Sequence, residues 1–305
     1  MRVVVLLLAF VAGAAPVAAH GPTPVSPDTF WRAWSFDPLV VGLLPVASWG
    51  YGRGACRLWT RAGLWRGIGR RHMAAFVLGL MVVIIALLSP LGRLGGTLLS
   101  AHMAQHGLLV AAAPLLLLLG KPGIAFVWAL PAGWSRGSLA AVAWRPLARA
   151  GRWLSRPLPA ATLHGLTLWI WHAPALFDAA VEREWLHTLE HASFFGTALL
   201  FWRAILDARS GTRIGLALAS AFATLMHGGL LGGLITMAPR PLYGCYSGRT
   251  DRWGLTVLGD QQLAGLLMWV PMGLVYFGAC LALAARFVAP ADRSLRSVGR
   301  VDGIP

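Results

Sequence analysis

The chain has 305 residues, of which 57% are hydrophobic and only 12% are charged. Soluble domains carry roughly 25% charged residues, so this composition excludes an ordinary soluble protein and indicates an integral membrane protein. The formal net charge of +15 does not indicate nucleic-acid binding, because the arginines occupy short loops between apolar segments, where they act as topology signals.

The N-terminus has the pattern of a secretory signal peptide. Arg2 precedes an apolar core, and Val17 and Ala19 suit the −3 and −1 positions of a signal-peptidase site. We therefore predict a signal peptide at 1–19, with an uncleaved anchor helix as the alternative. Cleavage leaves His20 at the new N-terminus, where its imidazole and the free amino group form an accessory site for Cu(II). A Pro-rich, aromatic extracytoplasmic segment, 20–37, follows.

Seven apolar runs follow, each near the ~20 residues that a helix needs to cross a bilayer. They predict an all-α integral membrane protein. Its seven-transmembrane-helix bundle, residues 38–288, follows the signal peptide and precedes a cytoplasmic tail, 289–305. The run 123–130 is too short to span, and 135–156 has the Trp, Leu and Arg pattern of an amphipathic helix on the inner surface. The predicted spans are 38–52, 73–89, 98–120, 158–177, 186–206, 214–237 and 261–287.

The loop charges predict the orientation of the bundle. With the N-terminus outside, the inner segments hold 19 of the 26 Lys and Arg residues, and the outer segments hold six. Because positive charge concentrates on the cytoplasmic side, we predict a multi-pass protein of the bacterial cytoplasmic membrane with an outer N-terminus and a cytoplasmic C-terminus. The outer six are Arg32, Arg93, Arg183, Arg240, Arg249 and Arg252.

Six histidines fall in the outer half of the predicted membrane domain. Two pairs of them are spaced four residues apart, so each pair shares one face of its helix. Ionisable groups at this depth are costly and by default mark a functional site. The candidate metal ligands are His102, His106, His172, His187, His191 and His227.

Other side chains near this layer suit accessory roles. Asp260 stands at the outer mouth of the seventh span and Glu190 lies in the fifth, where carboxylates orient imidazoles as hydrogen-bond acceptors. Met103 and Met237 add thioethers. Soft Met together with borderline His favours copper as the metal. We therefore predict copper binding at this layer.

Several alternatives to copper binding stay open. Membrane histidines also form hydrogen-bonded helix cores, bind haem, or relay protons in a transporter. His187, Glu190 and His191 match the short inverted zinc-peptidase pattern, which needs a distant acidic ligand to be complete. A retinal Schiff base is disfavoured, because the only lysine, Lys121, lies at the inner boundary.

The strings that carry these residues resemble a known family. They are HMAQHGLL at 102–109, WIWHAP at 169–174, WLH at 185–187 with Glu190 and His191, HGGLLG at 227–232, PRPLY at 239–243, DQQLAG at 260–265 and MWVP at 268–271. Together they resemble the caa3-type cytochrome c oxidase assembly factor family, often called CtaG, in its multi-span form. The resemblance covers nearly the whole mature chain.

The resemblance implies a function. It implies a non-enzymatic protein needed to make an active haem-copper oxidase by supplying copper. Its expected partners are haem-copper oxidase subunits, membrane lipid and a periplasmic copper chaperone as the donor. A histidine-lined proton or ion transporter and a metal-free assembly scaffold are the alternatives.

Overall fold

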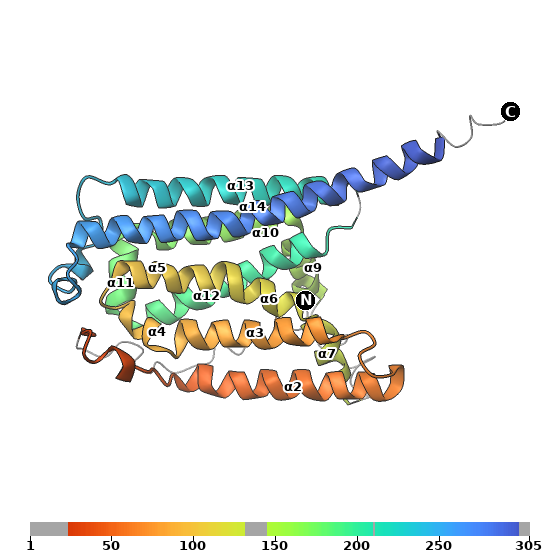
Figure 1. The fold of residues 1–305 in the computed structure, drawn as a ribbon, viewed down its shortest axis with the longest axis horizontal. Helices are drawn as coiled ribbons and strands as arrows, with labels where there is room; N and C mark the ends of the chain where they lie inside the picture. Colours follow the sequence, from red (N-terminus) through yellow and green to blue (C-terminus); the bar gives the residue numbers. More distant parts are fainter. Residues whose placement is uncertain (1–23, 132–144, 210, 299–305) are drawn as a thin grey trace.

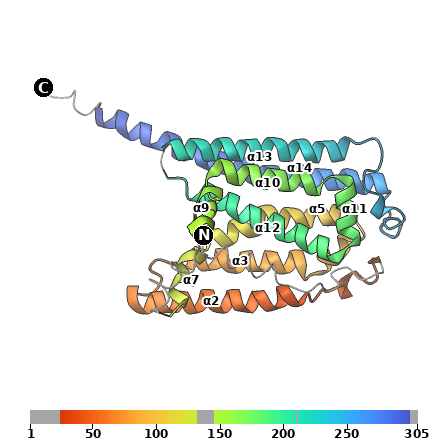
Figure 2. The same cartoon turned by 180° about the vertical axis from the view of Figure 1, so that it is seen from behind.

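The computed structural model describes residues 24–131, 145–209 and 211–298, and these residues form helices joined by short loops, with no strand among them. The long helices lie side by side, with α2 at one edge of the bundle and α13 at the other (Figures 1 and 2). They are α2 (Pro38–Ala62), α3 (Arg70–Leu87), α5 (Leu99–Gly107) continued by α6 (Ala113–Leu119), α10 (Pro157–Trp171), α12 (Glu184–Leu206), α13 (Gly211–Met237) and α14 (Val257–Val298).

Shorter helices cap both ends of the bundle. At one end lie α4 (Pro90–Leu94), α11 (Pro174–Glu182) and the 3-10 turns η1 (Phe30–Arg32), η4 (Gly244–Tyr246) and η5 (Asp251–Trp253). At the other end lie α7 (Pro122–Ala129) and α9 (Arg145–Leu154).

Four helical stretches in the described part of the chain are long and apolar enough to cross a membrane. They coincide with the predicted spans 73–89, 98–120, 214–237 and 261–287, and they support the prediction of an all-helical membrane protein. The other three predicted spans coincide with α2, with α10 and α11, and with α12. The four stretches are Arg70–Leu94, Leu99–Leu119, Gly211–Met237 and Val257–Val288.

The predicted fourth span, 158–177, is not one helix. α10 ends at Trp171, and α11 begins at Pro174. The proline ring disfavours helical backbone at the preceding residue, and Ala173 accordingly adopts an extended conformation with ψ 125°. The break leaves His172 at the C-terminal end of α10.

The predicted third span is continuous but contains a π-helical turn, η2 (Leu108–Ala112), between α5 and α6. A π turn interrupts the ordinary i to i−4 hydrogen bonds, and such turns are frequent at functional sites. The indole Nε1 of Trp202 on α12 donates to the carbonyl oxygen of Val110 over 2.9 Å. The irregular turn is therefore joined to the helix that packs against it.

The ends of the chain differ in part from the prediction. α14 continues to Val298, so the first part of the predicted tail, 289–305, is helical, and this part of α14 extends beyond the bundle (Figure 1). The predicted signal peptide, 1–19, and His20 lie outside the described residues. Of the predicted amphipathic helix 135–156, the structure describes α9, whereas residues 135–144 lie outside its described part.

Candidate metal centre

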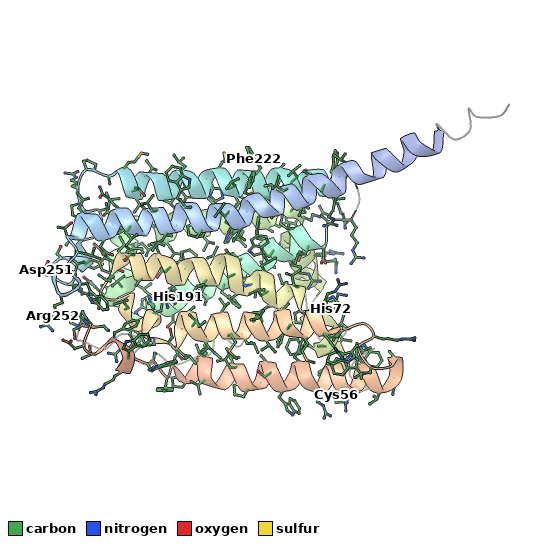
Figure 3. The ribbon with its side chains drawn as sticks, viewed as in Figure 1. Cys56, His72, His191, Phe222, Asp251 and Arg252 are labelled. Carbon is green, nitrogen blue, oxygen red and sulfur yellow. The ribbon has the colours of Figure 1, made fainter. Side chains whose placement is uncertain are left out.

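Four side chains from two helices converge in the interior of the bundle. His102 comes from α5, and His187, Glu190 and His191 come from α12. One nitrogen or carboxylate oxygen from each lies within 4.8 Å of the corresponding atom in the other three, and all four residues are buried. Figure 3 shows His191 inside the bundle, nearer the end that carries Asp251 than the end that carries His72.

The i to i+4 spacing predicted from the sequence produces this convergence. The ring centroids of His187 and His191 lie 4.0 Å apart on α12, and those of His102 and His106 lie 4.3 Å apart on α5. The two pairs face each other, with 5.3 Å between the rings of His102 and His187 and 5.3 Å between those of His106 and His191. Four of the six predicted ligands therefore lie in one group.

The carboxylate of Glu190 lies between α5 and α12, next to the imidazoles of His102 and His106. Its carboxylate oxygens lie 3.7 Å from Nε2 of His102 and 3.6 Å from Nε2 of His106, which is too long for a hydrogen bond. Both oxygens are buried and have no hydrogen-bond partner. Burying a carboxylate in this way is costly unless a cation compensates it.

The tautomer of His102 follows from its outer neighbour, Tyr246. The hydroxyl of Tyr246 donates to the carbonyl oxygen of Gly95 over 2.9 Å and lies 3.0 Å from Nδ1 of His102. Burial raises the pKa of this hydroxyl well above its usual value, so it keeps its single proton. Because the hydroxyl uses that proton in its hydrogen bond to Gly95, it can only accept from His102. Nδ1 of His102 is therefore the donor, and Nε2 of His102 carries a lone pair that faces Glu190.

His172 extends the site on the side of His106. Its Nδ1 lies 2.7 Å from the carbonyl oxygen of Leu168 and donates to it, since a carbonyl only accepts. Its Nε2 therefore carries a lone pair, and this lone pair faces the thioether sulfur of Met103 at 3.4 Å. The rings of His106 and His172 lie 5.8 Å apart. The sequence predicted both His172 and Met103 for this layer.

His227 and Met237 lie elsewhere. α13, which carries both, packs on α10 and α14 at the edge of the bundle. A Cβ added at Gly165 of α10 would lie 3.0 Å from Nε2 of His227, so this imidazole packs against α10 instead. The neighbouring His164 is hydrogen-bonded to Thr197 and Tyr276. Met237 is 74% exposed at the end of its helix.

Asp260 does not orient an imidazole as we predicted. Its carboxylate accepts hydrogen bonds from the backbone N–H of Leu99 over 2.6 Å and of Ser100 over 3.1 Å. The first N–H groups of a helix have no partner within it and attract negative charge, so Asp260 caps α5. It thereby holds the whole helix that carries His102 and His106, and it acts on the site only through that helix.

The loop before α14 contains a contact that the sequence did not predict. Tyr246, which fixes the tautomer of His102, is 144 positions away from it in the chain. Nothing in the local pattern around η4 marks this tyrosine. The neighbouring Cys245 is no evident ligand, because burial and then the adjacent Asp178 raise the pKa of its thiol and keep it neutral.

Comparisons with known proteins agree with the resemblance in the sequence. A family model described as cytochrome c oxidase caa3 assembly factor matches residues 49–289, which include the whole cluster. An uncharacterised protein of Mycobacterium bovis is 28% identical over 287 residues, covering 90% of this chain and 42% of that protein. One of Mycobacterium leprae is 27% identical over 283 residues, covering 89% and 42%. The chain thus spans less than half the length of these curated relatives. No solved structure matches the chain.

Proposed function

The chain belongs to the cytochrome c oxidase caa3 assembly factor family, and from this premise we propose that it binds copper and delivers it to a haem-copper oxidase. Copper is the cargo in this proposal, and the protein is not an enzyme. The recipient is a subunit of the oxidase, and a periplasmic copper chaperone is the donor.

The observation that carries the proposal is the set of buried polar atoms without a partner. Nε2 of His102, both ring nitrogens of His106 and both oxygens of Glu190 are buried without a hydrogen bond. Native proteins satisfy the large majority of such atoms, and each exception needs an explanation, such as an ion. A cation among the imidazoles would supply the missing partner and offset the charge of Glu190. The residues present therefore fit a metal ion.

The soft side chain beside the cluster favours copper over zinc or magnesium. Met103 is fully buried, and its sulfur faces the lone pair of His172, so neither atom gives the other a hydrogen bond. A thioether is a poor ligand for hard cations and a good one for Cu(I), and imidazole suits copper as well. We assign His102, His106, His187, His191 and Glu190 to the main site, with His172 and Met103 beside it.

We also propose that α2, α12 and the pair α10 and α11 cross the membrane together with the four apolar stretches. α12 buries His187, Glu190 and His191 in the interior of the bundle, so these polar residues lower the mean hydropathy of the helix without facing lipid. α10 has 15 residues and is ~22 Å long, shorter than the ~30 Å hydrocarbon core, and α11 lies across the end of the bundle after it (Figure 1). The cluster then lies in the outer half of the membrane.

The proposal is tested by oxidase activity in cells grown at limiting copper. We expect His106→Ala and His191→Ala to lower the activity strongly, while the amount of protein in the membrane stays near normal. Excess external copper should restore part of the activity, because mass action compensates a weakened site. His164→Gln is the matched control, since His164 is equally buried but bonds to Thr197 and Tyr276 outside the cluster.

The same experiment separates the alternative functions. A proton relay would lose activity in the variants and gain nothing from added copper. A metal-free scaffold would tolerate both substitutions as well as it tolerates His164→Gln. Full oxidase activity of both variants at limiting copper would mean that the histidine cluster is only a packed helix core.

A further inference from the structure

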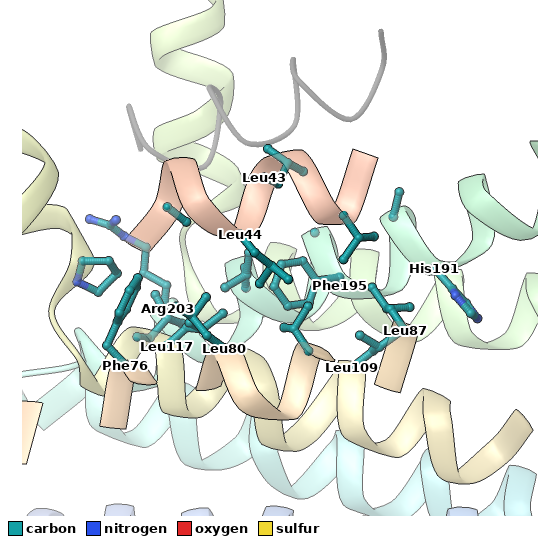
Figure 4. Close-up of a pocket in the computed structure, with 18 of the residues that line it drawn as sticks. Leu43, Leu44, Phe76, Leu80, Leu87, Leu109, Leu117, His191, Phe195 and Arg203 are labelled. Atoms are coloured by element: carbon teal, nitrogen blue, oxygen red, sulfur yellow. The ribbon is translucent and has the colours of Figure 1, made fainter. Parts of the chain in front are cut away.

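A cleft of about 720 Å³ runs along the bundle between α2, α3, α6 and α12. Figure 4 shows Arg203 and Phe76 at one end of this cleft and His191 at the other, with Leu80 and Phe195 between them. Most of its walls are apolar side chains, with leucine the most frequent. The two imidazoles that reach it are His187 and His191 of the cluster.

The cleft exists because α2 is attached to the bundle mainly through α7. Gly54 of α2 lies so close to the backbone of Ala125 on α7 that a side chain would not fit there. Nearby, Nη1 of Arg57 donates to the carbonyl oxygens of Ala129 over 3.0 Å and of Leu130 over 3.1 Å. The opposite half of α2, which contains Leu39, Leu43 and Leu44, faces the cleft instead.

The two ends of the cleft differ in charge. Lys121, Arg203 and Arg209 line one end, where the only acid among the lining residues is Asp207, 3.3 Å from Arg203. At the other end the charged residue is Asp37, whose carboxylate caps α2. An anionic group is therefore attracted to the first end only. The charge distribution of the loops identifies this end as the cytoplasmic one.

The dimensions of the cleft decide between a lipid and a helix as its occupant. Arg203 and His191 are 12 positions apart on α12, which is ~18 Å along the helix. One leaflet contributes about half of the ~30 Å hydrocarbon core, so an acyl chain fits this length. A helix of that length with its side chains would occupy roughly 1,400 Å³, about twice the volume of the cleft.

We propose that this cleft binds an anionic phospholipid of the inner leaflet. Its phosphate lies against Lys121, Arg203 and Arg209, and its acyl chain lies between α2 and α12. The end of the chain approaches His191 and fills the apolar part of the cleft beside the cluster. The proposal concerns the cleft alone and does not depend on which metal the cluster binds.

Native mass spectrometry of the full chain tests the proposal, after reconstitution in vesicles of equal parts phosphatidylglycerol and phosphatidylethanolamine and gentle extraction in detergent. We expect the protein to retain phosphatidylglycerol in preference to phosphatidylethanolamine. The triple variant K121Q/R203Q/R209Q should retain at least about tenfold less, since each basic residue near an anionic lipid surface contributes to binding. Leu44→Trp, which fills the cleft, should reduce retention of both lipids.

The matched control is the triple variant R183Q/R240Q/R252Q, which removes the same charge from exposed positions at the opposite end. It should retain phosphatidylglycerol like the unsubstituted protein. Equal retention of the two lipids, no retained lipid at all, or an equal loss in both triple variants would overturn the proposal. So would full retention by a well-folded Leu44→Trp protein, because the cleft would then not hold the acyl chain.

Discussion

A metal ligand needs a lone pair that faces the ion, and at His102 a single hydroxyl determines where that lone pair lies. The hydroxyl of Tyr246 accepts a hydrogen bond from Nδ1 and donates its own to the carbonyl oxygen of Gly95, which leaves the lone pair of His102 on Nε2, facing Glu190. Such outer partners fix the tautomer and orientation of an imidazole ligand. The structure therefore assigns Tyr246 a positioning role.

Tyr246→Phe should weaken copper binding by the purified protein by about 10–100-fold, the usual cost of losing an outer partner. Tyr243→Phe is the matched control, because its buried hydroxyl donates to the backbone oxygen of His172 and touches no imidazole nitrogen that we assign. Competition with a chromophoric Cu(I) chelator measures both affinities. Equal affinities of the two variants would remove Tyr246 from the site.

The sequence was a good guide to which histidines converge and a poorer guide to the residues that support them. His102, His106, His187 and His191 were predictable because i to i+4 spacing fixes the face that each pair shares. The roles of Asp260 and Tyr246 were not predictable, because their partners lie 161 and 144 positions away. A carboxylate at a helix mouth looks the same in the sequence whether it orients an imidazole or caps a neighbouring helix.

The position of the helices that carry the site depends on close packing between neighbouring helices. α13 and α14 pack along their length, and a Cβ added at Gly265 would lie 2.6 Å from the carbonyl oxygen of Gly232 and still closer to Thr236. Small residues allow membrane helices to approach in this way and to gain packing contacts. α14 in turn carries Asp260, which caps α5, so this contact supports the cluster indirectly.

Gly265→Ala should lower the stability of the bundle by about 1–3 kcal/mol, the typical cost of overpacking a tight contact. Gly278→Ala on the same helix is the control, because a Cβ there meets nothing within 4 Å. The midpoint of thermal unfolding in detergent should fall for the first variant and not for the second. An unchanged midpoint for Gly265→Ala would show that α13 and α14 accommodate the added methyl group with no loss of stability.

Helix boundaries were predicted less well than helix positions. All seven apolar runs contain helices, because an apolar run of this length reflects the thickness of the membrane. The break before Pro174 and the π turn at Leu108–Ala112 did not follow from the apolar pattern. Both irregularities are local and lie next to the site. The break before Pro174 follows His172, and the π turn follows α5, the helix that carries His106.

At the scale of the whole molecule, five of the six buried histidines in the described residues lie together in one part of the bundle. His102, His106, His172, His187, His191 and Glu190 form one buried group, whereas His227 packs against α10 near His164. The sequence placed His227 at the same depth, but depth alone did not show that α13 lies at the edge of the bundle. The cleft beside α2 was not predictable either, because it depends on how α2 and α7 pack.

The central claim is that the histidine cluster binds copper, and copper bound by the purified protein tests it most directly. The protein loaded with Cu(I) under reducing conditions should retain a stoichiometric amount of copper after removal of unbound metal. The double variant H102A/H191A should lose most of it, and His164→Gln should keep it, since His164 lies outside the cluster. Equal copper content in the double variant and the unsubstituted protein, both well folded, would contradict the account.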